Sequence, residues 1–205
     1  RHIRIHGAMR GYISTQESDP QRVVAKAQEL PPMQGLNLVD QVTTGKPYFW
    51  TDQGPQPVDL SDVPQQWTDA GPRVAVMDFG AKWNILRLLK ANGFQVLAVP
   101  SFTSAEEIKG IRPDAVFFSN GPGDPAALPE IVHTTALLAD SYPVGGICLG
   151  HQLLGLALGG TSFKLKFGHH GVNHPVRCLH TGHIEISSQN HGFCVDVSNV
   201  DTLKQ

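Results

Sequence analysis

PVGGICLGHQLLGLAL, residues 143–158, carries the clearest structural signal in the chain. An apolar run leads up to Cys148, a glycine follows two residues later, and leucines at helical spacing come next. This order is typical of a strand, a sharp turn and a helix. Small residues beside Cys148 let such a turn hold its side chain at the end of the strand, as in a nucleophile elbow.

An elbow predicts a reactive thiol. The helix that follows directs its N-terminal N–H groups toward the sulfur, which is expected to lower the pKa of Cys148 and favour the thiolate. The N–H of Leu149, the next residue, is in position to donate to an oxyanion. The alternative is a structural cysteine, because free cysteines are among the most buried residues in proteins.

The composition limits the class of protein. A chain of 205 residues forms one domain or two small ones. Its 16 basic and 18 acidic side chains leave a net charge of -2, which gives no electrostatic footprint for nucleic acid or an anionic membrane. A small molecule or a protein is the expected partner.

The three cysteines at positions 148, 178 and 194 have no paired spacing, which argues against a disulfide framework or a zinc module. No apolar run approaches the roughly 18 residues of a membrane span. A cytoplasmic protein is therefore expected.

Residues 1–70 are less regular than the rest, and residues 51–72 are rich in proline, glutamine, aspartate and glycine. We interpret residues 1–70 as the end of a smaller N-terminal domain with a surface linker, and residues 71–205 as a second domain. A short helix is expected over residues 21–30, before two prolines.

Strands and helices alternate from residue 73 onward. Strands are expected at 73–77, 94–99, 114–119 and before Cys148; helices are expected at 83–89, after the capping-box spacing of 104–107, and at 128–138. This alternation predicts an α/β fold with a doubly wound, mostly parallel sheet, which binds ligands beyond the carboxyl ends of its strands. Shorter strands are expected at 161–167, 175–178 and 184–188.

The loop NGPGDP, residues 120–125, directly follows one of these strands. Two glycines beside prolines give an unusual backbone whose N–H groups can face an anion. An ordinary turn explains the loop alone equally well. Beside an elbow on a neighbouring strand, the loop is interpreted as the second half of an oxyanion pocket.

The ten histidines identify neither a metal site nor a base. His169, His170 and His174 lack partners at the spacing of a zinc set, so no metal is predicted. His151 is expected to pack or cap the helix. His183 and Glu185 would share one face of a strand as a base with its orienting acid, but an exposed polar strand explains the pair more simply.

Taken together, these motifs resemble the class I (triad) glutamine amidotransferases and, within them, the small subunits of bacterial-type carbamoyl-phosphate synthetase. The resemblance rests on GICLGHQ at 146–152, SNGPGDP at 119–125, GLNLV and VTT at 35–39 and 42–44, DFGAKWNILR at 78–87, KFGHHGVNHPV at 166–176 and QNHGF at 189–193.

The resemblance implies glutamine hydrolysis through a thioester on Cys148, with the N–H groups of Leu149 and Gly121 as the oxyanion hole. The glutamine site would be lined by Gly121, Gly123, Leu149, Gln152, Asn190, Gly192 and Phe193. Ammonia would pass to a large synthetase subunit that makes carbamoyl phosphate for arginine and pyrimidine synthesis. ATP and metal ions are expected on that subunit, and no cofactor on this chain.

The family's base and orienting acid lie in a His-Pro-Glu segment after QNHGF, and no such segment occurs before residue 205. Aligned on QNHGF, His183 and Glu185 fall on an ordinary strand and are not this pair. From the resemblance we expect a fragment, short at both ends. Such a fragment is expected to be acylated at Cys148 but impaired in hydrolysis, because loss of a general base costs about 10²–10⁴-fold.

Three alternatives stay open. The first is a class I amidotransferase that serves anthranilate or GMP synthesis, which residues 1–70 and the HHGVNHP stretch disfavour. The second is a non-catalytic remnant that binds a partner, in which all three cysteines would react alike. The third is a cysteine peptidase on a related elbow fold, whose peptide cleavage glutamine would not inhibit.

Overall fold

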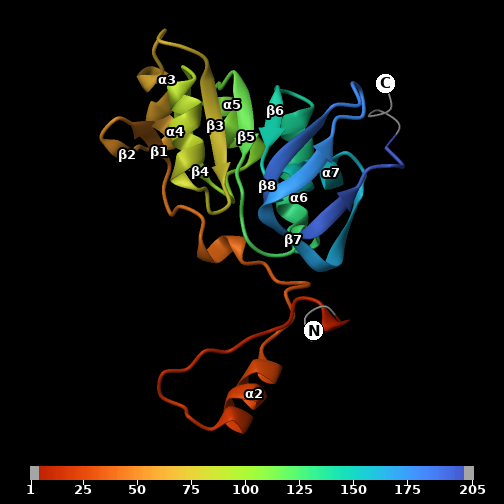
Figure 1. Cartoon of the computed structure of the whole chain (residues 1–205). Coiled ribbons are helices and arrows are strands. Elements are labelled where there is room, and N and C mark those ends of the chain that lie inside the picture. The colour runs from red at the N-terminus through yellow and green to blue at the C-terminus, as the bar shows by residue number, and fades with distance from the viewer. Residues whose placement is uncertain (1–4, 201–205) are drawn as a thin grey trace.

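The computed structural model describes residues 5–200, and a six-stranded sheet lies at its centre (Figure 1). The strand order is β2-β1-β4-β3-β5-β6. Neighbours among β4, β3, β5 and β6 are parallel, whereas β1 is antiparallel to both β2 and β4. The strands are β1 (Tyr48–Thr51), β2 (Gly54–Pro57), β3 (Arg73–Asp78), β4 (Gln95–Pro100), β5 (Ala115–Phe118) and β6 (Val144–Gly146). The predicted α/β class with a mostly parallel sheet is confirmed.

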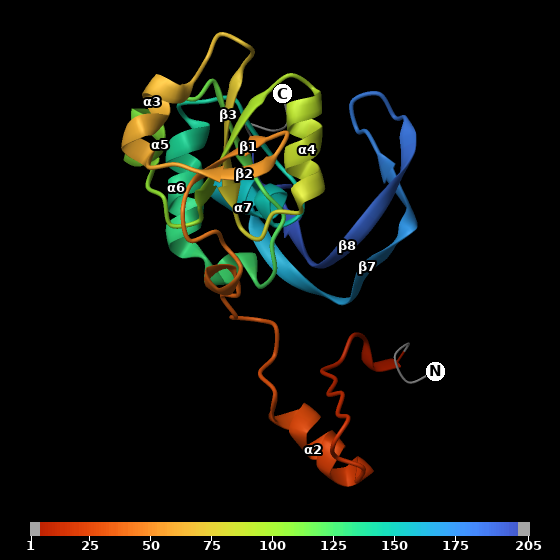
Figure 2. The same cartoon turned by 90° about the vertical axis from the view of Figure 1, so that its left-hand side faces the viewer.

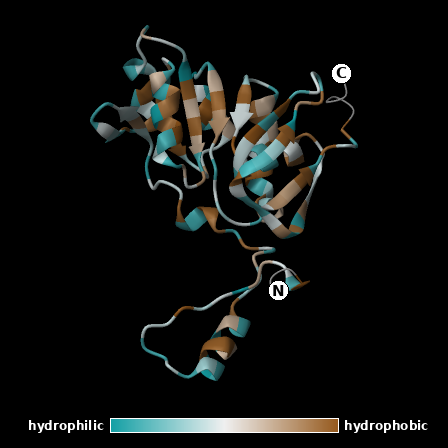
Figure 3. Ribbon diagram, viewed as in Figure 1, coloured by the Kyte–Doolittle hydropathy of each residue, from teal (hydrophilic) through white to brown (hydrophobic). Residues whose placement is uncertain are grey.

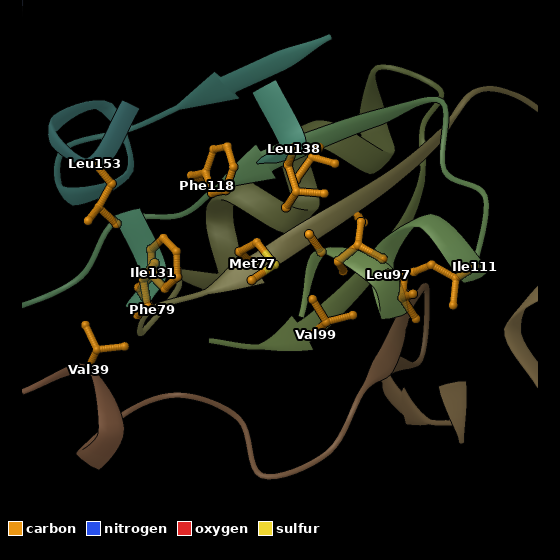
Figure 4. Packing of buried hydrophobic residues seen from close by; sticks show 14 of the residues in the cluster. Val39, Met77, Phe79, Leu97, Val99, Ile111, Phe118, Ile131, Leu138 and Leu153 are labelled. Atoms are coloured by element: carbon orange, nitrogen blue, oxygen red, sulfur yellow. The ribbon is translucent and has the colours of Figure 1, made fainter. Parts of the chain in front are cut away.

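The central strands are buried on both faces. In β3 and β4 every residue after the first is buried, as expected where helices cover both sides of a parallel sheet. Met77 and Phe118 belong to the core on one face (Figure 4), and Val76 and Ala98 to the core on the other. Figure 3 shows the hydrophobic residues concentrated in this central layer.

Helices cover both faces of the sheet (Figure 2). Leu86 joins α4 to one core, while Ile108, Leu138 and Leu153 join α5, α6 and α7 to the other. The predicted capping box is present, because Ser104 and Glu107 bond reciprocally at the start of α5. The helices around the sheet are α3 (Val63–Gln66), α4 (Trp83–Ala91), α5 (Ala105–Gly110), α6 (Pro129–Ala139) and α7 (Leu149–Ala157). Three short 3-10 helices accompany them: η1 (Val39–Gln41), η2 (Leu60–Asp62) and η3 (Pro125–Ala127).

The prediction that residues 51–72 form a surface linker is wrong in part. This segment contains β2 at the edge of the sheet and α3, and it buries Val58 and Val63 in the core. Its prolines obscured the strand, although an edge strand tolerates proline because one side needs no ladder bonds. The assignment of residues 1–70 to a separate domain stays a prediction.

An N-terminal arm extends away from the sheet and carries α2 (Pro20–Glu29), in agreement with the predicted short helix (Figure 1). The side chain of Asp19 caps this helix, and none of its residues is buried. The arm touches the body where the Ala8 N–H donates to Lys166 O at 3.0 Å.

The last part of the described chain is a hairpin of two long antiparallel strands, β7 (Thr161–Arg177) and β8 (Ile184–Asp196). The prediction of three short strands is therefore wrong. The pairing register shifts twice, between Lys164 and His169 and between Gly171 and His174. These irregularities interrupt the alternation that marks a strand in sequence. Within residues 5–200, no helix is long and apolar enough to cross a membrane.

Candidate functional site

The predicted elbow is present at the end of β6. The strand ends at Gly146, and α7 begins at Leu149. Cys148 stands between them with φ 55° and ψ -108°, a backbone conformation that side chains rarely adopt and that is found where a fold holds a functional residue. A Cβ on Gly150 would lie 2.1 Å from Phe118 O, so only glycine lets α7 approach β5 so closely.

The thiol of Cys148 is half buried, and its surroundings act on its pKa in opposite directions. Burial raises the pKa, while a hydrogen bond from the Leu149 N–H and the charge of Lys82 lower it, and the net result is a raised pKa. The expected shift toward thiolate is therefore wrong. The helix start donates to the sulfur as predicted, but desolvation of the charged form outweighs that bond.

The loop of residues 120–125, the glycine loop, packs directly against the elbow. A Cβ on Gly121 would lie 2.7 Å from Leu149 Cδ2 and 2.5 Å from Phe79 O. Gly123 has φ 95°, and a Cβ there would lie 2.8 Å from Leu36 O. The loop and the elbow are thus brought together, with glycine required at both positions. The oxyanion role of the Leu149 and Gly121 N–H groups stays a prediction.

Residues of β8 complete the surroundings of the thiol. Asn190 O lies 3.9 Å from Cys148 Sγ, and Asn190 Oδ1 lies 2.7 Å from His170 Nδ1. Phe193 is buried, and Lys164 Nζ lies 5.6 Å from the centre of its ring. A strand far from the elbow in sequence therefore lies beside Cys148.

Gln152 connects α7 to this strand. Its side chain is buried, and its Nε2 donates to Phe193 O at 2.7 Å. At least one amide hydrogen of Gln152 is thus used in a hydrogen bond to the protein backbone. This contact gives Gln152 a structural role beside the glutamine contact that the resemblance implies.

We expect Gln152→Leu to lower the free energy of unfolding by about 0.5–1.5 kcal/mol, because Phe193 O would lose one of its two hydrogen-bond partners and keep only His191 Nδ1. Urea unfolding followed by circular dichroism measures the change. Gln28→Leu, an exposed position within α2, is the matched control and is expected to change stability by less than about 0.5 kcal/mol. An equal loss in both variants would contradict the anchoring role.

The candidate residues meet at a cavity of about 1990 Å³, bounded by the N-terminal arm, the glycine loop, α7 and β8. All the predicted site residues except Leu149 line it; they are Gly121, Gly123, Cys148, Gln152, Asn190, Gly192 and Phe193. Leu149 is buried behind them. The cavity exceeds the roughly 300–1,000 Å³ of common ligand pockets, so a small ligand would fill only part of it.

Sequence reasoning missed several side chains near the site. Lys82, whose charge lowers the pKa of the Cys148 thiol, lines the cavity. His151, which was expected to pack against or cap the helix, also lines it. The ligand-capable atoms of His169, His191 and Cys194 lie within 4.8 Å of one another. His183 and Glu185 form an exposed pair at 3.7 Å and do not line the cavity. The proximity of His169, His191 and Cys194 depends on how β7 pairs with β8, which sequence spacing alone does not show.

The chain is similar to known proteins along its whole length. The chain is 60% identical over 204 residues to the carbamoyl phosphate synthase small chain of Solidesulfovibrio magneticus, and 58% identical to that of Nitratidesulfovibrio vulgaris strain Hildenborough. Both alignments cover 100% of this chain and 54% of the relative, so the chain spans about half the length of these relatives.

The solved structure of a glutamine amidotransferase from Thermotoga maritima matches with 15% identity and a TM-score of 0.43, over 63% of this chain and 64% of that one. The family model for class-I glutamine amidotransferases matches residues 75–205, a range that begins within β3 and contains β4, β5, β6, the glycine loop, the elbow and the hairpin. The chain therefore belongs to the class-I glutamine amidotransferase family.

Proposed function

We propose that this chain provides the glutaminase part of a carbamoyl phosphate synthase, with Cys148 as its nucleophile. The observation that carries the proposal is the conformation of Cys148, whose positive φ places the thiol at a strand-to-helix turn beside a glycine loop. The similarity to carbamoyl phosphate synthase small chains supports the choice among amidotransferases.

In the proposed reaction, the thiolate of Cys148 attacks the side-chain amide carbon of glutamine. Negative charge moves to the amide oxygen, which accepts hydrogen bonds from the N–H groups of Leu149 and Gly121. The C–N bond breaks, and the nitrogen takes up a proton and leaves as ammonia. Water then hydrolyses the thioester, which releases glutamate and restores the thiol.

Asn190, Gly192 and Phe193 are proposed to hold glutamine from the β8 side of the cavity, opposite Gly123. The ammonia would be used by a large synthetase subunit with ATP and bicarbonate to make carbamoyl phosphate, for arginine and pyrimidine synthesis. We propose no cofactor for the glutaminase reaction, because the thiol and the backbone N–H groups supply its nucleophile and its charge stabilisation.

Selective alkylation tests the glutamine pocket. We expect a chloroketone analogue of glutamine to label Cys148 first, and free glutamine to slow the labelling. Iodoacetamide is expected to label Cys178 first, because Cys178 is exposed and hydrogen bonds from Thr181 lower its pKa, whereas burial raises the pKa of Cys148. Peptide mass mapping after short reaction times measures both orders.

Cys148→Ser provides the control for site assignment, and it should leave the reaction of Cys178 with iodoacetamide unchanged. If Cys178 reacted first with both reagents and glutamine gave no protection, no glutamine pocket would surround Cys148. That result would overturn the proposed function.

A further inference from the structure

A second group of chemically active side chains lies on the hairpin, beside the candidate site. His169 on β7 pairs in register with His191 on β8, and Cys194 follows on β8. Each offers one ligand atom, and these atoms lie within 4.8 Å of one another. All three residues are half buried, so the group is sheltered and still accessible. The proposed glutaminase reaction uses none of them.

The spacing suits a tetrahedral metal ion. Zinc binds nitrogen at about 2.0–2.1 Å and sulfur at about 2.3 Å, which places neighbouring ligand atoms about 3.3–3.6 Å apart. His169 Nδ1 and His191 Nε2 lie 3.2 Å apart, close to that separation. The sulfur of Cys194 lies within 4.8 Å of one nitrogen of each histidine, so a displacement of about 1 Å by side-chain rotation would bring it to the same ion.

The bonds around His191 make its Nε2 available to a cation. Phe193 O lies 2.7 Å from Nδ1, and Gln189 Oε1 lies 3.0 Å from Nε2. Both oxygens are acceptors, and a neutral imidazole has only one N–H, so it satisfies one of them. The carbonyl of Phe193 fixes the proton on Nδ1, as backbone carbonyls do for metal-bound histidines. The electron pair on Nε2 then faces Gln189 Oε1 and the Nδ1 of His169. In the His169 tautomer that carries its proton on Nε2, both imidazoles present an electron pair to the same point, where a metal ion can bind.

We propose that His169, His191 and Cys194 form a binding site for a divalent cation of the zinc type. Two imidazoles and one thiolate favour zinc over magnesium or calcium, which prefer oxygen ligands. Binding replaces the thiol proton of Cys194, which is released to solvent, by a sulfur–zinc bond. Because His191 and Cys194 line the cavity, the fourth ligand position is available to water or to an occupant of the cavity.

The proposed site differs from the prediction of no metal, which rested on the spacing of residues in the sequence alone. His169, His170 and His174 were treated as a set without completing ligands, but the hairpin register instead joins His169 to residues on the opposite strand. A metal here would also fix the strand beside the thiol, since Asn190, whose carbonyl lies 3.9 Å from Cys148 Sγ, directly precedes His191. This inference goes beyond the proposed function and does not depend on it.

Titration of the metal-free 205-residue chain with Zn²⁺, followed by calorimetry, tests the proposal. The titration is performed in the Cys148→Ser background, which removes a competing thiol in the same cavity. We expect one ion bound per chain, with protons released on binding. Co²⁺ in place of Zn²⁺ is expected to give the near-ultraviolet charge-transfer band of a cobalt–thiolate bond.

Cys194→Ala is expected to abolish this band and to weaken Zn²⁺ binding by at least about 10–100-fold, since even indirect partners of a metal contribute that much. Cys178→Ala, the same change at an exposed cysteine, should keep both the band and the affinity. His169→Asn provides a second variant that weakens binding, and circular dichroism verifies that each variant is folded.

Absence of saturable Zn²⁺ binding would overturn the proposal, and a proton on His191 Nε2 would then account for the contact with Gln189. Equal affinity in the Cys194→Ala and Cys178→Ala variants would also overturn it. Because Cys148 is absent from the titrated protein, failure here is separate from failure of the proposed glutaminase function.

Discussion

Gly150→Ala is expected to lower the free energy of unfolding by about 3 kcal/mol or more, at the upper end of the cost of overpacking. A Cβ at this position would lie 2.1 Å from Phe118 O and 2.5 Å from Phe118 C. Both are backbone atoms of a central strand, so no side chain can rotate to make room. The helix α7 would have to move away from β5, and Cys148 would move with it. Urea unfolding of the variant measures the loss.

Gly110→Ala is the matched control for this substitution. Gly110 is the last residue of α5, and apart from its chain neighbours and the adjacent helix backbone, no described atom lies within 4 Å of the Cβ that alanine would add. Its effect is expected to stay within about 1 kcal/mol, in the stabilising direction, because alanine restricts the unfolded chain. Similar losses in the two variants would show that the close approach of α7 to β5 does not explain the requirement for glycine.

The parts of the fold that the sequence predicted are those fixed by local chemistry. The buried strands β3 and β4 each contain a continuous run of four apolar residues, VAVM and VLAV. The Ser104 capping box sets the start of α5 within one turn. At the elbow, small residues and a following leucine-rich helix lie within a short segment. In each of these cases the residues that determine the element lie within it or next to it, so the local sequence is enough to predict the structure.

Long-range pairing explains most of what the sequence did not predict. The strand β2 contains two prolines and becomes a strand only by pairing with β1. The hairpin strands are longer than predicted because their bulges disturb the alternation. The proximity of His169 to Cys194 depends on this same register.

The pKa of Cys148 shows a third reason why some properties of the site could not be predicted from the sequence. The helix start that donates to the sulfur was predicted from local sequence, and the Leu149 N–H does so. The burial that outweighs it arises from segments far apart in the chain, including Asn190, which contacts the sulfur. The sign of a pKa shift is a difference between opposing effects, and local sequence supplied only one of them.

Glutamine is expected to acylate Cys148 and to leave a glutamyl thioester that accumulates. Within residues 5–200, the groups that lower the thiol pKa are the Leu149 N–H and Lys82. Neither is a general base, and the paired His183 and Glu185 do not line the cavity. Without a carboxylate-oriented histidine among the described residues beside the thioester, we expect the attack of water to be slow relative to acylation. Cys148→Ser should carry no adduct, because removal of a nucleophile from such a unit costs on the order of 10⁶-fold.

The pH dependence of this acylation follows from the direction of the pKa shift. Burial raises the pKa of the Cys148 thiol above its ordinary value, so the thiolate is a minor species near neutral pH. Its fraction then increases about tenfold for each pH unit below the pKa. The rate of adduct formation is expected to rise by about that factor between pH 7 and pH 8.

Intact-mass spectrometry of the folded chain after incubation with glutamine, with Cys148→Ser in parallel, tests the nucleophilic role of Cys148 most directly. A mass increase of one glutamyl group, mapped to the peptide that contains Cys148 and absent from the serine variant, is the result we predict. An unmodified Cys148 throughout the incubation, at pH 8 and with circular dichroism that shows a folded chain, would contradict the account.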